Sequence, residues 1–149
     1  MTVGVETRVF DLLLVEDNPG DIRLIEEALK EGNIPHRLHK VRDGAEATEF
    51  LFRTGQHADA PRPDLVLLDL NLPKKDGREV LAEIKADRRL KLIPVVVLTT
   101  SEAQSDILKA YDLNANCYIT KPVDLDEMIK VVLALEGFWL GIVKLPRLE

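Results

Sequence analysis

Short apolar runs and amphipathic stretches alternate along the whole chain. Runs rich in Leu, Val and Ile are typical of buried strands, and they fall at residues 10–15, 37–41, 65–68, 94–98 and 117–119. Apolar residues at helical spacing predict helices near residues 19–31, 45–53, 78–87 and 125–135, and one that holds Ile107, Leu108 and Tyr111. Asn18 before Pro19 predicts a capped helix start, and Ser101 with Gln104 predicts a capping box.

This alternation predicts an α/β fold. Continuous apolar strands joined through helices indicate a parallel sheet with helices on both faces. Five such units are too few for a closed eight-stranded barrel, so we expect an open, doubly wound, five-stranded sheet. In such sheets, ligands bind beyond the carboxyl ends of the strands, which all meet at one rim.

Composition narrows the class of protein. The chain has 149 residues, of which 46% are apolar and 31% charged, as in a single globular domain. Its 26 Asp and Glu outnumber 20 Lys and Arg, which weakens any case for nucleic acid. One cysteine suits a reducing compartment, and neither a membrane span nor a secretion signal is visible. We therefore expect a cytoplasmic protein without a nucleic-acid or membrane partner.

The predicted strand ends carry polar residues that suit phosphoryl chemistry. Glu16 and Asp17 follow the first strand, Asp69 the third, Thr99 the fourth and Lys121 the fifth. Carboxylates about 4 Å apart repel each other by about 4 kcal/mol at an effective dielectric constant of 20. A hard cation such as Mg²⁺ removes that cost, and it leaves coordination sites for phosphate oxygens. A lysine and a hydroxyl suit a phosphoryl group, and a carboxylate can act as its nucleophile.

Four motifs at these positions resemble the receiver domain of two-component response regulators. They are Leu13-Leu14-Val15-Glu16-Asp17-Asn18, Leu67-Leu68-Asp69-Leu70-Asn71-Leu72-Pro73, Val97-Leu98-Thr99 and Tyr118-Ile119-Thr120-Lys121-Pro122. The intervals of 30 residues from Asp69 to Thr99 and 22 from Thr99 to Lys121 are similar to those of the family. The resemblance covers residues 10–135.

The resemblance implies a flavodoxin-like sheet with strand order 2-1-3-4-5 and a defined phosphorylation site. Asp69 would accept a phosphoryl group from a sensor histidine kinase. Mg²⁺, or Mn²⁺ in its place, would bind to Glu16, Asp17, Asp69 and the backbone carbonyl of Asn71. Lys121 would contact the phosphoryl oxygens. The chain would catalyse only its own phosphorylation and dephosphorylation, and would not be an enzyme in the usual sense.

The resemblance also implies a conformational switch. Thr99 would move toward the phosphoryl group, and Tyr118 would turn inward into the space that Thr99 leaves. The bond between Lys121 and Pro122 would be a cis peptide, which is rare for X–Pro bonds in general. Asn71 and Ser101 occupy positions that influence the lifetime of the phosphoryl group in the family.

Two regions depart from the compact members of the family. The loop at residues 54–63 and the C-terminus, residues 136–149, look like the response regulators of cyanobacterial phytochromes, so the kinase would be a phytochrome. Residues 1–9 would form an N-terminal segment, and no output domain is expected. Glu16 stands where many members carry Asp.

The tail residues Phe138, Trp139 and Leu140 have two interpretations. They fold back as local core, or they form the interface of a symmetric homodimer with the helix around residues 107–111, the strand at 117–119 and the last helix. We favour the dimer.

Three other functions were weighed. A degenerate receiver would act as a phosphorylation-independent binding module. An aspartyl-phosphate hydrolase would need a second acid where Asn71 stands. A flavodoxin-like cofactor protein would need a first loop rich in Gly or Ser/Thr, which the chain lacks.

Overall fold

A five-stranded parallel sheet forms the centre of the molecule in the computed structural model, which describes residues 8–148. The strands are β1 (Phe10–Val15), β2 (His36–Val41), β3 (Leu65–Leu68), β4 (Val95–Thr99) and β5 (Cys117–Thr120). Their order across the sheet is β2-β1-β3-β4-β5, and every neighbouring pair is parallel. The doubly wound sheet and its strand order are confirmed. Most of the expected N-terminal segment, residues 1–9, lies outside the described residues.

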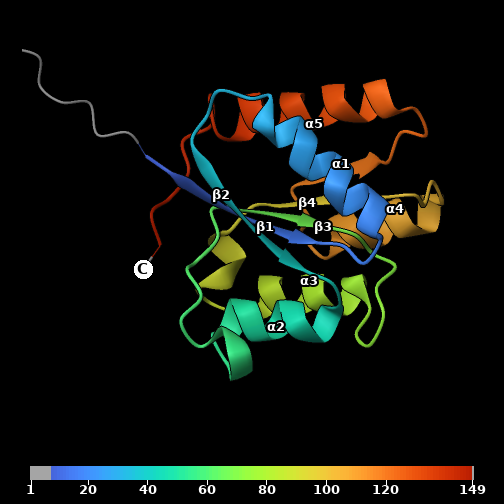
Figure 1. Cartoon of the computed structure of the whole chain (residues 1–149). Coiled ribbons are helices and arrows are strands. Elements are labelled where there is room, and N and C mark those ends of the chain that lie inside the picture. Colours follow the sequence, from blue (N-terminus) through green and yellow to red (C-terminus); the bar gives the residue numbers. More distant parts are fainter. Residues whose placement is uncertain (1–7, 149) are drawn as a thin grey trace, which may run out of the picture.

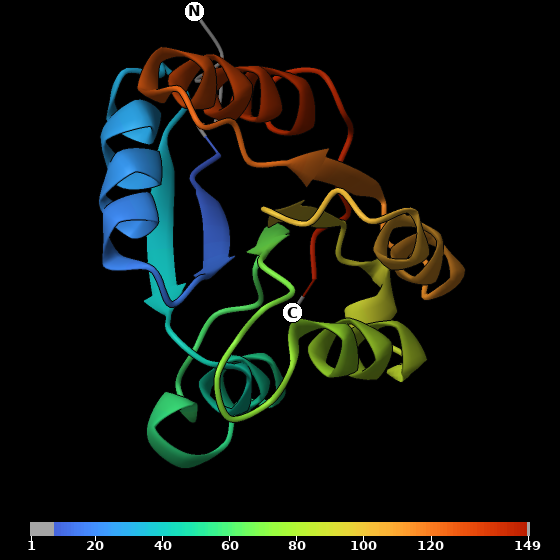
Figure 2. The same cartoon turned by 90° about the vertical axis from the view of Figure 1, so that its right-hand side faces the viewer.

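Helices cover both faces of this sheet. Helices α1 (Pro19–Lys30) and α5 (Leu125–Trp139) pack on one face, and α2 (Gly44–Phe52) and α3 (Gly77–Ala86) pack on the other (Figure 1). Helix α4 (Gln104–Asp112) lies beside the β5 edge (Figure 2). Alternate residues of each strand point to opposite faces, so each face has its own core. Leu13 and Val15 belong to one core, and Leu12 and Leu14 to the other.

Local sequence signals explain most helix starts. The side chains of Asn18, Asp43, Asp76 and Asp124 each accept a hydrogen bond from a backbone N–H in the first turn of the helix that follows. Pro19 occupies the first position of α1, as its capping pattern predicts. Each strand lies within one residue of its predicted bounds at both ends.

The predicted capping box of α4 is wrong. Ala103 is the N-cap, and no side chain caps this helix. The Ser101 hydroxyl instead donates to a carboxylate oxygen of Asp106 at 2.6 Å. The Ser101 oxygen also accepts from the N–H of Ala103 at 3.3 Å, so Ser101 lies two residues before the N-cap and holds the β4–α4 loop against the helix.

The last helix runs four residues beyond its expected end at Leu135. Its buried positions continue at helical spacing through Met128, Val132 and Leu135, and Leu140 just after the helix is buried in the same core. The helix tolerates Gly137 because this apolar stripe keeps packing. Part of the expected C-terminal extension, residues 136–149, is therefore an integral part of the fold.

The expected loop at residues 54–63 is ordered by side-chain contacts. It contains a short 3₁₀ helix, η1 (Gly55–His57), and His57 contacts the Glu46 carboxylate at 3.1 Å. Pro63 is buried, and the Arg62 side chain donates to the carbonyl of Leu51.

In the part of the chain that the structure describes, no helix has the length and apolar character that a membrane crossing requires.

Candidate phosphorylation site at the carboxyl ends of the strands

Three carboxylates converge where β1 and β3 end. One oxygen from each of Glu16, Asp17 and Asp69 lies within 4.8 Å of the others. Glu16 and Asp69 are buried, whereas Asp17 is exposed. The parallel pairing of β1 with β3 sets this arrangement, because it aligns Val15 with Leu68 and so brings the next residues to the same rim.

Lys121 lies at the centre of an acidic cage. Its ammonium nitrogen is 3.1 Å from Asp69 Oδ2, 2.9 Å from Asp21 Oδ2, and in contact with Glu16 Oε1. The side chain of Lys121 is only 5% exposed. The sequence analysis anticipated the contact with Asp69 but missed Asp21, which lies in the first turn of α1. No spacing in the sequence indicates this contact, because it depends on how the first turn of α1 is oriented.

Burial and charge strongly perturb this cage. Burial, together with the neighbouring Asp69 carboxylate, raises the pKa of Glu16 to about 7, although Lys121 opposes the shift. Burial disfavours the charge of Lys121, but hydrogen bonds to Glu16 and Asp21 outweigh it and raise the pKa of the ammonium group. Three carboxylates thus contact one ammonium group and Asp17 lies beside two of them, so the excess negative charge favours a bound cation.

The donor set fits a divalent metal ion. At a typical Mg²⁺–oxygen distance of about 2.1 Å, octahedral ligand oxygens lie about 3–4 Å apart, close to the spacing of these carboxylates. All donors are hard oxygens, which suits Mg²⁺ or Mn²⁺. Asn71 follows in the exposed loop after Asp69, and its N–H donates to Asp69 Oδ1 at 3.3 Å. The role of the Asn71 carbonyl stays a prediction.

Thr99 carries an unsatisfied hydroxyl beside this cage. The residue at the end of β4 is completely buried, and its Oγ1 has no hydrogen-bond partner among the described residues. A buried hydroxyl without a partner costs about 1–3 kcal/mol, so native structures rarely keep one. This donor is therefore available to an oxygen that is absent from the unphosphorylated chain.

Tyr118 faces the interior and contacts the β4–α4 loop at Ser101. Its ring packs against the core that faces α2 and α3, and its hydroxyl donates to the carbonyl oxygen of Ser101 at 2.9 Å. Asp106 accepts from the Ser101 hydroxyl and forms an ion pair with Arg78 at 2.7 Å. The β4–α4 loop is thereby connected to α3, which starts just after the Asp69 loop.

The backbone around Asp69 is packed closely. A Cβ atom at Gly77 would lie 2.2 Å from the carbonyl oxygen of Asp69, so only glycine allows α3 to begin here.

The predicted cis bond before Pro122 is wrong, because no peptide bond between residues 8 and 148 is cis. The trans form is the intrinsically preferred one, and Lys121 reaches Asp69 from it.

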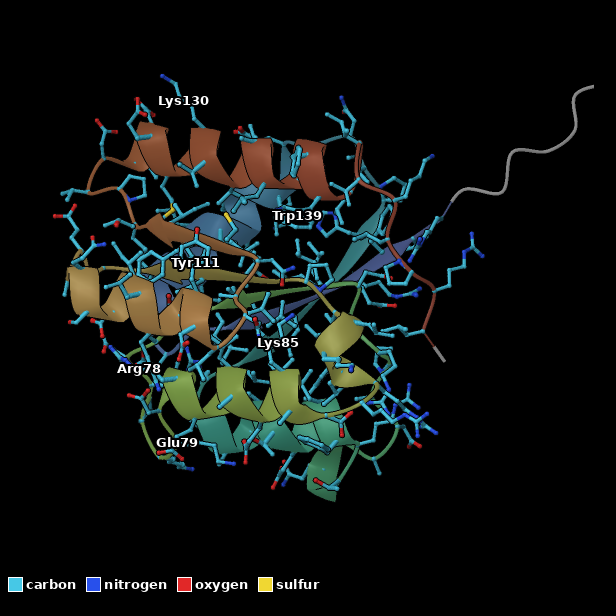
Figure 3. All side chains as sticks on the ribbon, turned by 180° about the vertical axis from the view of Figure 1, so that it is seen from behind. Arg78, Glu79, Lys85, Tyr111, Lys130 and Trp139 are labelled. Atoms are coloured by element: carbon cyan, nitrogen blue, oxygen red, sulfur yellow. The ribbon has the colours of Figure 1, made fainter. Side chains whose placement is uncertain are left out.

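The expected interface residues divide into two groups. Leu140 is only 6% exposed and packs in the core with α1, so its expected place at an interface is wrong. Phe138 is 51% exposed, and Trp139 beside it lines an apolar groove of about 390 Å³ between β5 and α5. Trp139 and Tyr111 lie on one side of the molecule, next to β5 (Figure 3).

Comparisons with known proteins agree with this geometry. A sequence model of the response regulator receiver domain matches residues 12–133. The chain is 54% identical to response regulator Rcp1 of Synechocystis sp., over 91% of this chain and 92% of the relative. It is also similar to the crystal structure of the phosphorylated cyanobacterial phytochrome response regulator RcpA, with 56% identity, coverage of 94% and 100%, and a TM-score of 0.91. The Mn²⁺-bound form of Rcp1 matches with 53% identity, coverage of 93% and 99%, and a TM-score of 0.90.

Proposed function

The chain belongs to the response regulator receiver domain family, and we propose that it accepts a phosphoryl group on Asp69 from a sensor histidine kinase. One observation carries this assignment. Asp69 lies between a carboxylate pair that suits a metal ion and a lysine that suits phosphoryl oxygens, beside an unpartnered threonine hydroxyl. Each of these groups matches one requirement of phosphoryl transfer.

The transfer step follows from the position of Asp69. A carboxylate oxygen of Asp69 attacks the phosphorus of a phosphohistidine, a P–O bond forms, and the P–N bond to the imidazole breaks. The electron pair of that bond returns to the imidazole nitrogen. Glu16, Asp17 and Asp69 would hold a metal ion, which would supply charge neutralisation for the phosphoryl oxygens. The same site releases the group when water attacks the acyl phosphate.

Lys121 holds Asp69 before transfer and the phosphoryl oxygens afterwards. Its ammonium nitrogen is 3.1 Å from the Asp69 carboxylate and nearly buried, so it acts as a fixed point charge beside the reacting group. Asp21 positions Lys121 through the 2.9 Å contact from the opposite side. Because Asp21 competes for the ammonium group, it limits how strongly Lys121 stabilises the phosphorylated form.

Phosphorylation is read through Thr99 and Tyr118. The buried Thr99 hydroxyl gains its missing partner by donating to a phosphoryl oxygen. This movement shifts the β4–α4 loop, to which Tyr118 is bonded through the carbonyl of Ser101. The surface formed by α4 and β5 changes as a result, and a partner detects that surface.

The partner kinase is of the phytochrome type. The similarity to Rcp1 covers 91% of this chain, and the similarity to the phytochrome response regulator RcpA covers 94%. Such a kinase would place the chain in the cytoplasm, in agreement with its lone cysteine. The excess of acidic residues argues against a function on nucleic acid.

The surface formed by α4 and β5 also forms a symmetric homodimer. β5 is an edge strand, and Leu108, Tyr111 and Phe138 around it are each about half exposed or more. Exposed apolar residues at such a density mark association sites. Sedimentation should show a dimer that Phe138→Glu dissociates and that Phe52→Glu, at an exposed phenylalanine of α2, leaves intact. A monomer at micromolar concentration with and without phosphorylation would exclude the dimer.

Phosphotransfer tests the assignment. A phytochrome-type kinase loaded with labelled phosphate should transfer the label to the wild type in the presence of Mg²⁺, and not to Asp69→Asn. Label that moves equally well from an unrelated sensor kinase would remove the phytochrome assignment and keep the receiver. A wild type that takes no label from kinases or small phosphodonors would instead be a degenerate receiver.

A further inference from the structure

Arginines gather at the end of the molecule opposite to Asp69. Arg62, Arg88, Arg89 and Arg147 line a cavity of about 390 Å³ together with Leu92 and Leu148, and we name it the arginine groove. It adjoins a second cavity of about 400 Å³ through Arg62, Arg147 and Leu148, so the two form one extended channel. Figure 3 shows nitrogen-bearing side chains crowded beyond the C-terminal end of α3.

The four arginines of the groove have no ion-pair partner among residues 8–148. This is unusual in a chain where acidic residues outnumber basic ones by 26 to 20. The acidic residues along the channel are already engaged: Asp64 pairs with Arg8, Asp11 pairs with Arg37, and Asp87 accepts from backbone N–H groups. The negative charge of Asp87 offsets part of the charge of Arg62 and Arg89, and the four arginines still leave an excess of positive charge in the groove.

Arg62 shows the cost of this arrangement. Its Nε is buried and has no hydrogen-bond partner within the described range. Burial and the nearby guanidinium groups of Arg53 and Arg89 lower the pKa of Arg62. Like charges held close together destabilise the free protein, and an anionic ligand would relieve that repulsion.

We propose that the arginine groove binds an acidic segment of a partner protein, with carboxylates spaced along an extended peptide and an apolar residue among them. The guanidinium groups come from three separate segments and are spread along two adjoining cavities, which suits spaced carboxylates better than one compact anion. Leu92, which is 52% exposed, provides an apolar contact beside them. A long nucleic acid would extend from the groove onto an acidic surface, which disfavours it.

The groove and the phosphorylation site lie at opposite ends of the strands. The C-terminal residues that line the groove are on the side where the strands begin (Figure 1). The four residues of β3 alone separate the two ends by about 13 Å at 3.3 Å per residue. A partner in the groove leaves Asp69 accessible to a kinase, so binding there does not depend on phosphorylation and can tether the chain near its kinase or target.

Binding of a defined peptide tests this proposal. The probe is a fluorescein-labelled peptide of the repeating sequence Glu-Leu-Glu-Glu, and its anisotropy is followed with the full chain, without Mg²⁺ or phosphodonor. Arg88→Glu/Arg89→Glu should weaken binding at least tenfold, because both side chains are exposed and form no ion pair among residues 8–148. Arg147→Ala should weaken it several-fold and guards against a folding defect, which circular dichroism also checks.

A charge-matched control separates a site from general attraction. Arg23→Glu/Lys109→Glu changes the net charge equally at exposed positions of α1 and α4, and it should leave the affinity within twofold of the wild type. Equal loss in both double variants, or no binding by the wild type, would overturn the proposal. The proposal would also be overturned if triphosphate or single-stranded DNA displaced the peptide and bound more tightly than the peptide does. The occupant of the groove would then be a phosphate-bearing ligand.

Discussion

Removal of one of the three carboxylates that could hold a metal ion should stabilise the metal-free protein. In Asp17→Asn, the site loses a charge whose oxygen lies within 4.8 Å of oxygens from Glu16 and Asp69. Each such pair repels by about 3 kcal/mol at an effective dielectric constant of 20, and by about 1 kcal/mol in water. Asp17 is exposed, so the weaker value applies and we expect a gain of about 1–2 kcal/mol in the free energy of unfolding in EDTA.

Mg²⁺ should reverse this order. Ligand binding to the folded state adds about 1.4 kcal/mol at ten times the dissociation constant and about 2.7 kcal/mol at a hundred times. The wild type gains this energy, whereas Asp17→Asn has lost a ligand and gains much less. Urea unfolding with and without Mg²⁺ should therefore give curves whose midpoints exchange order between the two conditions.

A remote charge change serves as the control. Asp59→Asn removes the same charge from an exposed position in the loop before β3, and it should respond to Mg²⁺ as the wild type does. If Asp17→Asn is less stable than the wild type in EDTA, carboxylate repulsion does not dominate the site. An equal Mg²⁺ response in all three proteins would show that Asp17 is not a ligand.

Three further predictions concern Thr99, Asp21 and Asp11. Thr99→Val removes the unpartnered hydroxyl at equal volume, so urea unfolding should show a gain of about 1 kcal/mol in the free energy of unfolding. In this variant the phosphorylation-induced change in Tyr118 fluorescence should vanish, whereas Thr99→Ser should keep that change. The reasoning fails if both variants behave alike. Asp21→Asn removes about 1 kcal/mol of repulsion toward an anionic donor, so phosphorylation by acetyl phosphate should be roughly fivefold faster, and an unchanged rate would refute the role of Asp21. The pKa of Asp11 is lowered because hydrogen bonds from Arg37 and His39 outweigh its burial. The ionised Asp11 carboxylate therefore stabilises the fold above about pH 4, and this stabilisation is lost as the pH falls through the folded-state pKa. Asp11→Asn should flatten the acid side of the plot of stability against pH, and an equally steep acid side would contradict this.

The sequence predicted the elements of the fold closely because their signals are local. Each strand is a continuous apolar run, and four helix starts carry a capping side chain. The end of α5 was missed because the family resemblance ended at Leu135, whereas burial of Leu140 against α1 is a tertiary effect. Ser101 was assigned wrongly because the helix begins two residues after it, and its hydrogen bond to Asp106 depends on the folded β4–α4 loop.

The site was predictable where it depended on the order of strands. Parallel topology alone brings Glu16, Asp17 and Asp69 to one rim, as expected. The third acidic partner of Lys121 depends on how the first turn of α1 is oriented, which no spacing in the sequence specifies. The arginine groove was hidden for another reason: its residues come from distant segments, and a net charge of −6 conceals a local excess of positive charge.

Intact mass spectrometry tests the central claim most directly. The 149-residue chain is incubated with acetyl phosphate and Mg²⁺, and its mass is recorded against Asp69→Asn and against an EDTA sample. The account predicts one added phosphoryl group on the wild type, absent from both controls. A wild type without the added mass, or an Asp69→Asn variant that carries it in equal amount, would contradict the assignment of Asp69 as the phosphoacceptor.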